Sequence, residues 1–133
     1  MIISLYAAIL AILFAVLSMR VIRLRRQLQI GLGDAGDKNM LRAISVHSNF
    51  SEYVPISLLL IFLVESQAGY TWFVHGLGVC LLVGRLSHAY GVSQANENYS
   101  FRVFGMTMTF TSIISSSIYL LFTYTRNVIN AIA

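Results

Sequence analysis

The segment MIISLYAAILAILFAVLSM, residues 1–19, contains no Asp, Glu, Lys or Arg, and the apolar run ends at Arg20. At a rise of 1.5 Å per residue, about 20 apolar residues cross a hydrocarbon core that is about 30 Å thick. The segment therefore predicts a membrane-spanning helix. Its basic residues follow the apolar run, and no small-residue cleavage site closes it, so we interpret it as a retained anchor and not as a signal peptide.

Three further apolar stretches follow the first, at residues 40–64, 66–84 and 103–125. The second carries Arg42 and Glu52, and we expect the third to continue as a helix to about Tyr90. Only 11% of the 133 residues are charged and 57% are hydrophobic, whereas about 25% charged residues are usual in a soluble domain. Because lipid cannot satisfy open sheet edges, the pattern predicts an all-α membrane protein with one domain over residues 1–133, a bundle of four transmembrane helices.

Basic residues gather in the connection between the first two stretches, at Arg20, Arg23, Arg25, Arg26 and Lys38. Residues 65–70, which connect the second and third stretches, include no Lys or Arg. The positive-inside rule then places the first connection in the cytoplasm and both termini outside it. We therefore expect an integral multi-pass protein of the inner membrane, if the source is bacterial. Basic residues spaced between apolar runs suit a membrane better than a nucleic acid.

Two apparent motifs have simpler explanations. The segment Gly31-Leu32-Gly33-Asp34-Ala35-Gly36 has the spacing of a dinucleotide fingerprint, but no strand precedes it, so we interpret it as a turn between two helices. No two of the three histidines, His47, His75 and His88, are spaced four residues apart as a pair of metal ligands on one helix face would be. Cys80 is the single cysteine, so it can build neither a disulfide within the chain nor a Cys-ligated zinc site. The sequence thus predicts no metal site.

A polar face interrupts the second stretch. At 100° per residue, its members fall within an arc of about 100°, and they are Arg42, Ser45, Asn49, Glu52 and Tyr53. A carboxylate in a span costs about 2.5 to 3.5 kcal/mol on insertion scales, so we expect Glu52 to face the interior of the bundle with a partner. An ion pair that fixes helix packing is one explanation. We favour a ligand site because other polar groups share the face.

Cationic groups from the other stretches are expected near the same membrane level. Arg23 and Arg26 follow the first stretch at its cytoplasmic end, Arg85 and His88 lie one turn apart in the helical continuation of the third, and Arg102 directly precedes the fourth. Snorkelling to anionic head groups explains most of the first cluster, and it is a weaker explanation for Arg85 and Arg102. Small polar residues also repeat along the fourth stretch, where they predict helix–helix contact; they are Thr109, Ser112, Ser116, Tyr119 and Thr123.

Three segments carry a family resemblance: Arg23-Leu24-Arg25-Arg26, Asn49-x-x-Glu52-Tyr53-x-Pro55 and Gly84-Arg85-Leu86-Ser87-His88. Together they resemble the membrane-associated proteins in eicosanoid and glutathione metabolism, the MAPEG family, over essentially the whole chain. The resemblance implies a homotrimer that binds glutathione between neighbouring subunits, with the site open to the cytoplasm and the membrane.

The resemblance also implies residue roles. The residues that it assigns to glutathione binding are Arg23, Arg26, His47, Asn49, Glu52, Tyr53, Arg85 and His88. His47 is expected to reach the ligand across a subunit boundary, and Arg102 looks like the arginine that activates the thiol. Ser45 departs from the family, which commonly has arginine at that position, and we expect Arg42, one turn earlier, to replace the missing contact.

The resemblance therefore implies a glutathione-dependent transferase or peroxidase embedded in the membrane. Glutathione has two carboxylates, one amine and a thiol. The carboxylates suit Arg23, Arg26 and Arg42, the amine suits Glu52, and the thiol suits Arg102. The thiolate would attack a lipophilic electrophile or hydroperoxide that arrives from the lipid. Two alternatives stay open: a non-catalytic protein that binds lipids or a partner, and a small four-helix transporter.

Overall fold

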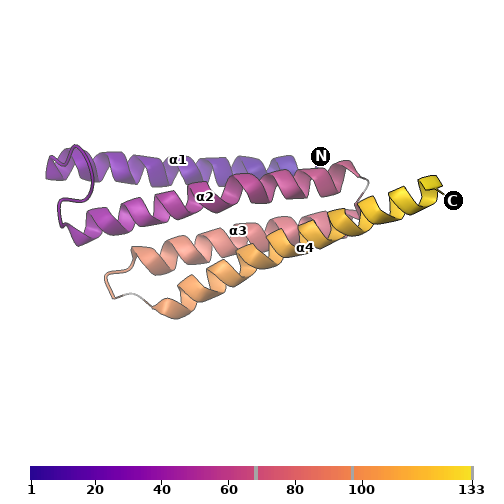
Figure 1. The fold of residues 1–133 in the computed structure, drawn as a ribbon. Helices are drawn as coiled ribbons and strands as arrows, with labels where there is room; N and C mark the ends of the chain where they lie inside the picture. Colours follow the sequence, from indigo (N-terminus) through magenta and orange to yellow (C-terminus); the bar gives the residue numbers. More distant parts are fainter. Residues whose placement is uncertain (68, 97, 133) are drawn as a thin grey trace.

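The computed structural model describes residues 1–67, 69–96 and 98–132. These residues form helices α1 (Ile3–Leu28), α2 (Lys38–Ser66), α3 (Thr71–Ser93) and α4 (Tyr99–Ile132), without a strand in the described ranges. Consecutive helices run in opposite directions, so α1 begins and α4 ends at the same end of the bundle (Figure 1). The prediction of an all-α bundle of four helices is confirmed.

Most of the bundle has the dimensions of a membrane protein. Within the described ranges, α1, α2 and α4 are long and apolar enough to cross a membrane. α3 is also largely apolar, and it carries His75, Arg85 and His88. Large apolar side chains cover the outer surface, such as Ile12 on α1 and Leu121 on α4, which are 68% and 66% exposed. The outside of the bundle is therefore suited to lipid.

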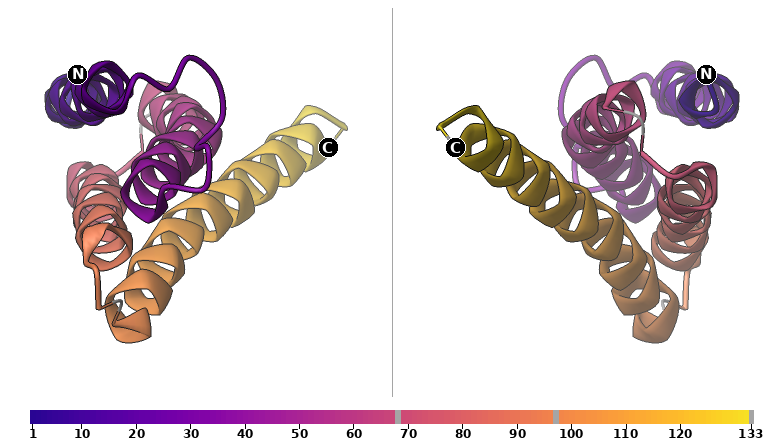
Figure 2. Two further views of the ribbon diagram at one scale, coloured as in Figure 1. Left: turned by 90° about the vertical axis from the view of Figure 1, so that its left-hand side faces the viewer. Right: turned by 90° about the vertical axis from the view of Figure 1, so that its right-hand side faces the viewer.

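α3 and α4 make the closest crossing in the bundle. A Cβ atom added to Gly105 would lie 2.6 Å from the carbonyl oxygen of Gly84 and 2.6 Å from the backbone nitrogen of His88. Ser112 is fully buried and donates a hydrogen bond to the Leu77 carbonyl at 3.1 Å. Thr109, Ser116 and Thr123 are buried as well, which confirms the predicted helix–helix stripe. Beyond this crossing α4 leans away from the other helices (Figure 2).

The basic connection between α1 and α2 is a turn that the two helix ends hold in place. Gly33 and Gly36 have φ angles of 66° and 79°, which glycine adopts without steric cost. Arg25 donates hydrogen bonds to the carbonyls of Gly31 and Gly33. Asp37 caps α2, because its carboxylate accepts from the Met40 backbone N–H at 2.8 Å. The interpretation of the glycine-rich segment as a turn is confirmed.

Glu65 connects the far end of α2 to the beginning of α1. Its carboxylate accepts hydrogen bonds from the backbone N–H groups of Ile2 and Ile3. The first N–H groups of a helix have no partner within the helix, and Ile2 offers no side-chain cap of its own. Glu65 therefore supplies a tertiary cap whose negative charge meets the positive end of the α1 dipole.

We expect Glu65→Ala to lower the free energy of unfolding by about 1 to 2 kcal/mol, the usual effect of losing a helix cap. Glu65→Gln should lower the free energy of unfolding by less, because the glutamine amide oxygen can still accept a hydrogen bond. Thermal unfolding in detergent measures both variants, with Ser66→Ala as the control at the same helix end. Equal stability of Glu65→Ala and the parent chain would contradict the capping role.

Which end of the bundle faces the cytoplasm stays a prediction. The positive-inside rule places the basic α1–α2 connection there. A reporter fused after Ala133 should then be active only in its extracytoplasmic form, whereas a reporter inserted at Gly33 should be active only in its cytoplasmic form. Reversed signals at the two positions would overturn the orientation.

Candidate functional site

A basic cavity opens at the end of the bundle where α2 and α4 begin and α3 ends. Its volume is about 460 Å³. The described residues that line it are Lys38, Leu41, Arg42, Ser45, Asn49, His88, Val92 and Arg102. Lysine, two arginines and a histidine are among them, and the described lining includes no acidic side chain. The cavity is therefore suited to a ligand with negative charge.

Helix periodicity explains why these residues meet. Lys38, Arg42, Ser45 and Asn49 are spaced by four, three and four residues, so they share one face of α2. His88 and Val92 are four residues apart on α3, and Arg102 lies in the beginning of α4. The positive end of the α4 dipole adds to the charge of Arg102 at this place.

Arg42 holds the end of α3 while it lines the cavity. Its guanidinium donates to the carbonyls of Val92 at 3.1 Å and Ala95 at 3.4 Å. The last carbonyls of a helix lack partners within the helix, so Arg42 serves as a cap for α3. Its place beside Ser45 in the cavity agrees with the expectation that it supplies the cation that Ser45 lacks.

Asn49 is the point where the cavity meets the core of the bundle. Arg85 is 1% exposed and donates through Nη1 to the Asn49 Oδ1 at 2.7 Å. The Arg85 guanidinium carbon lies 5.7 Å from the centre of the Tyr53 ring, and Tyr53 packs edge-on against Phe110. Arg85 and Tyr53, both predicted to contact the ligand, do not line the cavity and lie behind Asn49.

Glu52 does not face the interior of the bundle. It lies near the middle of α2, and its side chain is exposed on the surface of the single chain. No hydrogen bond or ion pair joins it to any residue that the structure describes. The expectation of an interior partner is therefore wrong for the single chain, because the α2 face that bears Ser45 and Glu52 is covered by no other helix of the chain.

His47 lies on the side of α2 that faces α1. Its Nε2 is 3.0 Å from the Ser18 hydroxyl oxygen, and its ring stacks on Phe14 with 5.0 Å between the ring centres. The structure thus does not bring His47 to the basic cavity of its own chain.

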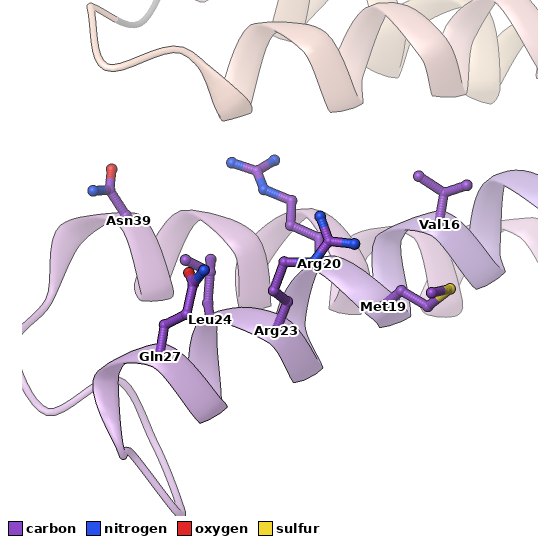
Figure 3. Close-up of a pocket in the computed structure, with 7 residues that line it drawn as sticks. All are labelled: Val16, Met19, Arg20, Arg23, Leu24, Gln27 and Asn39. Atoms are coloured by element: carbon purple, nitrogen blue, oxygen red, sulfur yellow. The ribbon is translucent and has the colours of Figure 1, made fainter.

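Arg23 and Arg26 also lie outside the basic cavity. Arg23 lines a second cavity of about 450 Å³ between α1 and α2, together with Arg20, Gln27 and Asn39 (Figure 3). Arg26 lies on the adjoining exposed surface of α1. Within one chain the predicted ligand residues therefore separate into a group at the basic cavity and a group on α1.

Sequence reasoning missed three members of the cavity, which are Lys38, Leu41 and Val92. Lys38 was assigned only to the basic connection, although its spacing to Arg42 and Ser45 already places it on the same helix face. Leu41 gives the cavity an apolar wall. The predicted residues that the structure does bring together there are Arg42, Asn49, His88 and Arg102.

Comparison with known proteins agrees with the fold. The model of the MAPEG family matches residues 3–122, and the chain belongs to this family. The chain is 37% identical over 114 residues to the inner membrane protein YecN of Escherichia coli, with 86% of each sequence covered, and the same match is found in a second strain. No solved structure matches it. With its apolar helices, the chain is an integral inner-membrane protein.

Proposed function

We propose that the chain is a glutathione-dependent enzyme that conjugates or reduces lipophilic molecules taken from the membrane. The observation that carries the proposal is the basic cavity, which brings Lys38, Arg42, His88 and Arg102 together at one end of the helix bundle. A cavity with this charge suits the two carboxylates of glutathione. The α2 motif and the membership of the MAPEG family support glutathione, a tripeptide with a thiol, as the ligand.

We further propose that the site is completed in a homotrimer. Glu52 supports this step, because an ionised carboxylate that meets lipid in the middle of a span is costly and needs a partner. Ser45, Ser48 and Glu52 form an exposed polar stripe on α2, and such stripes suit contact with another helix in a membrane. In the assembly, α1 of a neighbouring subunit would bring Arg23 and Arg26 to the ligand, and Glu52 would meet its amine.

The proposed chemistry depends on the thiolate of glutathione. A guanidinium beside a thiol lowers the thiol pKa from its usual value of about 8.5, so more thiolate is present at neutral pH. Arg102 is the candidate, because it lines the cavity at the positive end of α4. With an aryl halide, the sulfur forms a carbon–sulfur bond, halide leaves and the thiol proton passes to water. With a hydroperoxide, two glutathione molecules give the disulfide, an alcohol and water.

The test uses the protein purified in detergent. Glutathione-dependent turnover of a generic aryl halide or a lipid hydroperoxide is the expected result. Glutathione binding without turnover of either substrate would instead favour the non-catalytic alternative, which agrees with serine at position 45. Absence of both binding and turnover would overturn the proposal.

Glu52→Gln is expected to weaken glutathione binding by about tenfold and to leave folding intact, since a neutral amide is cheaper to bury than a carboxylate. Calorimetric titration measures the affinity, and cross-linking measures the assembly. Glu65→Gln is the matched control, because it makes the same chemical change at the C-terminal end of α2, outside the proposed site. A Glu52→Gln trimer with unaltered affinity would refute the role of Glu52.

A further inference from the structure

Arg85 is the one large cation that the fold buries completely among the described residues, with 1% of its surface exposed. No carboxylate within the described ranges contacts it. Its shortest hydrogen bond, at 2.7 Å, goes to the side-chain oxygen of Asn49. We propose that Arg85 is a positioning residue that fixes the Asn49 amide with its NH₂ group toward the basic cavity, and that this orientation makes the cavity prefer anions.

The orientation of the amide follows from the chemistry of the two side chains. A guanidinium has five N–H donors and no acceptor, whereas an asparagine amide has an oxygen at one end and an NH₂ group at the other. Only the oxygen of Asn49 can therefore face Arg85, because the reversed amide would set N–H against N–H. Asn49 lines the cavity and Arg85 does not, so the NH₂ group is the end left for a ligand.

The surroundings of Arg85 keep its guanidinium in place. Nη2 donates to the sulfur of Met106 at 3.3 Å, and the Tyr53 ring lies against the same group. These contacts come from α2 and α4, while Arg85 itself belongs to α3. Three helices thus determine where the donor to Asn49 lies, and the Asn49 amide cannot turn without breaking a charge-assisted hydrogen bond.

Packing alone gives no reason for an arginine here. Nε of Arg85 is buried and has no hydrogen-bond partner among the described atoms. An apolar side chain of similar size often serves a buried position as well as an ion or better. The orientation of Asn49 is a function that an apolar side chain would not perform.

The rest of the cavity agrees with a preference for anions. Lys38 and Arg102 carry only donors, and the Ser45 hydroxyl already donates to the Leu41 carbonyl at 2.8 Å. Asn49 is then an uncharged side chain of the lining whose NH₂ group can donate to a ligand carboxylate. The identity of this ligand as glutathione rests on the proposed function, whereas the preference for anions does not.

The experiment measures the ratio of two affinities, for glutathione and for its diethyl ester, which keeps the peptide and the thiol and loses both carboxylate charges. Asn49→Leu removes the donor without changing the charge of the protein, and we expect the ratio to fall about tenfold, the effect of one hydrogen bond to a charged group. Arg85→Met should lower the ratio by about threefold or more, because the Asn49 oxygen then lacks its partner. Ser51→Ala is the matched control and should keep the ratio, because Ser51 lies on α2 outside the basic cavity and its hydroxyl donates to the His47 carbonyl.

The double variant Asn49→Leu/Arg85→Met separates positioning from long-range charge. If Arg85 acts through Asn49, Arg85→Met has no further effect on the ratio once Asn49 is leucine. A drop of the same size in both backgrounds would show that Arg85 acts by its charge and would overturn the proposal. Should Asn49→Leu alone fail to assemble, the double variant and Arg85→Met, both without a buried cation, are compared directly. The proposal expects the ratio of the double variant to be at most about threefold lower than that of Arg85→Met, whereas independent effects would make it about tenfold lower.

The same cycle distinguishes this inference from the proposed function. If the parent protein binds no glutathione, the proposed function fails, and the affinity for inorganic sulfate is measured in each variant instead. Sulfate binding that is lost in Asn49→Leu and kept in Ser51→Ala would support the role of Arg85 and Asn49 without glutathione. A parent protein that binds neither anion would overturn both proposals.

Discussion

Arg102→Ala is expected to lower turnover at saturating glutathione by about a hundredfold, the loss that follows removal of one group that stabilises developing or reacting negative charge. The pKa of the bound thiol should rise toward its usual value, because the guanidinium no longer favours the thiolate. Thiolate absorbance and initial rates, recorded across pH, measure both effects. The structure supports this prediction by placing Arg102 in the basic cavity at the beginning of α4.

Arg26→Ala provides the contrast for this prediction. Arg26 lies on the α1 surface and lines no part of the basic cavity. If a neighbouring subunit brings it to a carboxylate of glutathione, its loss should raise the glutathione concentration that is needed and leave the saturated rate nearly unchanged. A parental rate and thiol pKa in Arg102→Ala would contradict the assignment. Arg42 would then be the next candidate, because it lines the same cavity.

Gly105→Ala is expected to destabilise the bundle by about 3 kcal/mol or more, at the upper end of overpacking effects. The added Cβ would lie 2.6 Å from two backbone atoms of α3, the Gly84 oxygen and the His88 nitrogen. Backbone atoms cannot rotate away as a side chain can, so α3 and α4 would have to separate. Thermal unfolding in detergent measures the loss.

Gly76→Ala is the control for this substitution. Gly76 also lies in a helix, and a Cβ atom added there meets nothing within 4 Å. Alanine at this place should keep or slightly raise the stability, since glycine is the poorer helix former. Similar stability of Gly105→Ala and Gly76→Ala would contradict the close crossing of α3 and α4.

Most of the fold could be predicted because membrane dimensions and helix periodicity act within each segment. The apolar run of residues 1–19 predicted α1, and the small polar residues from Thr109 onward predicted the contact of α4 with another helix. The spacing of Arg42, Ser45 and Asn49 placed three cavity residues on one face. Each of these inferences needs only the geometry of a single helix.

The remainder of the site depends on contacts between helices, which periodicity does not supply. Glu52 lies at nearly the same angular position on α2 as Ser45 and both are exposed, yet Ser45 lines the cavity and Glu52 does not. Arg85 is a residue type that often binds anionic ligands, but side chains of α2 and α4 enclose it behind Asn49. A helical wheel gives the angle of a side chain and does not say which neighbour covers it.

The polarity of α3 has a consequence for the biosynthesis of the protein. Within the described ranges, α3 is the helix whose apolar sequence contains a completely buried arginine. Its Arg85 finds its partners on α2 and α4, and α4 emerges from the ribosome after it. We expect α3 to wait beside the insertion machinery until α4 is made, so that the two helices enter the lipid together as a hairpin.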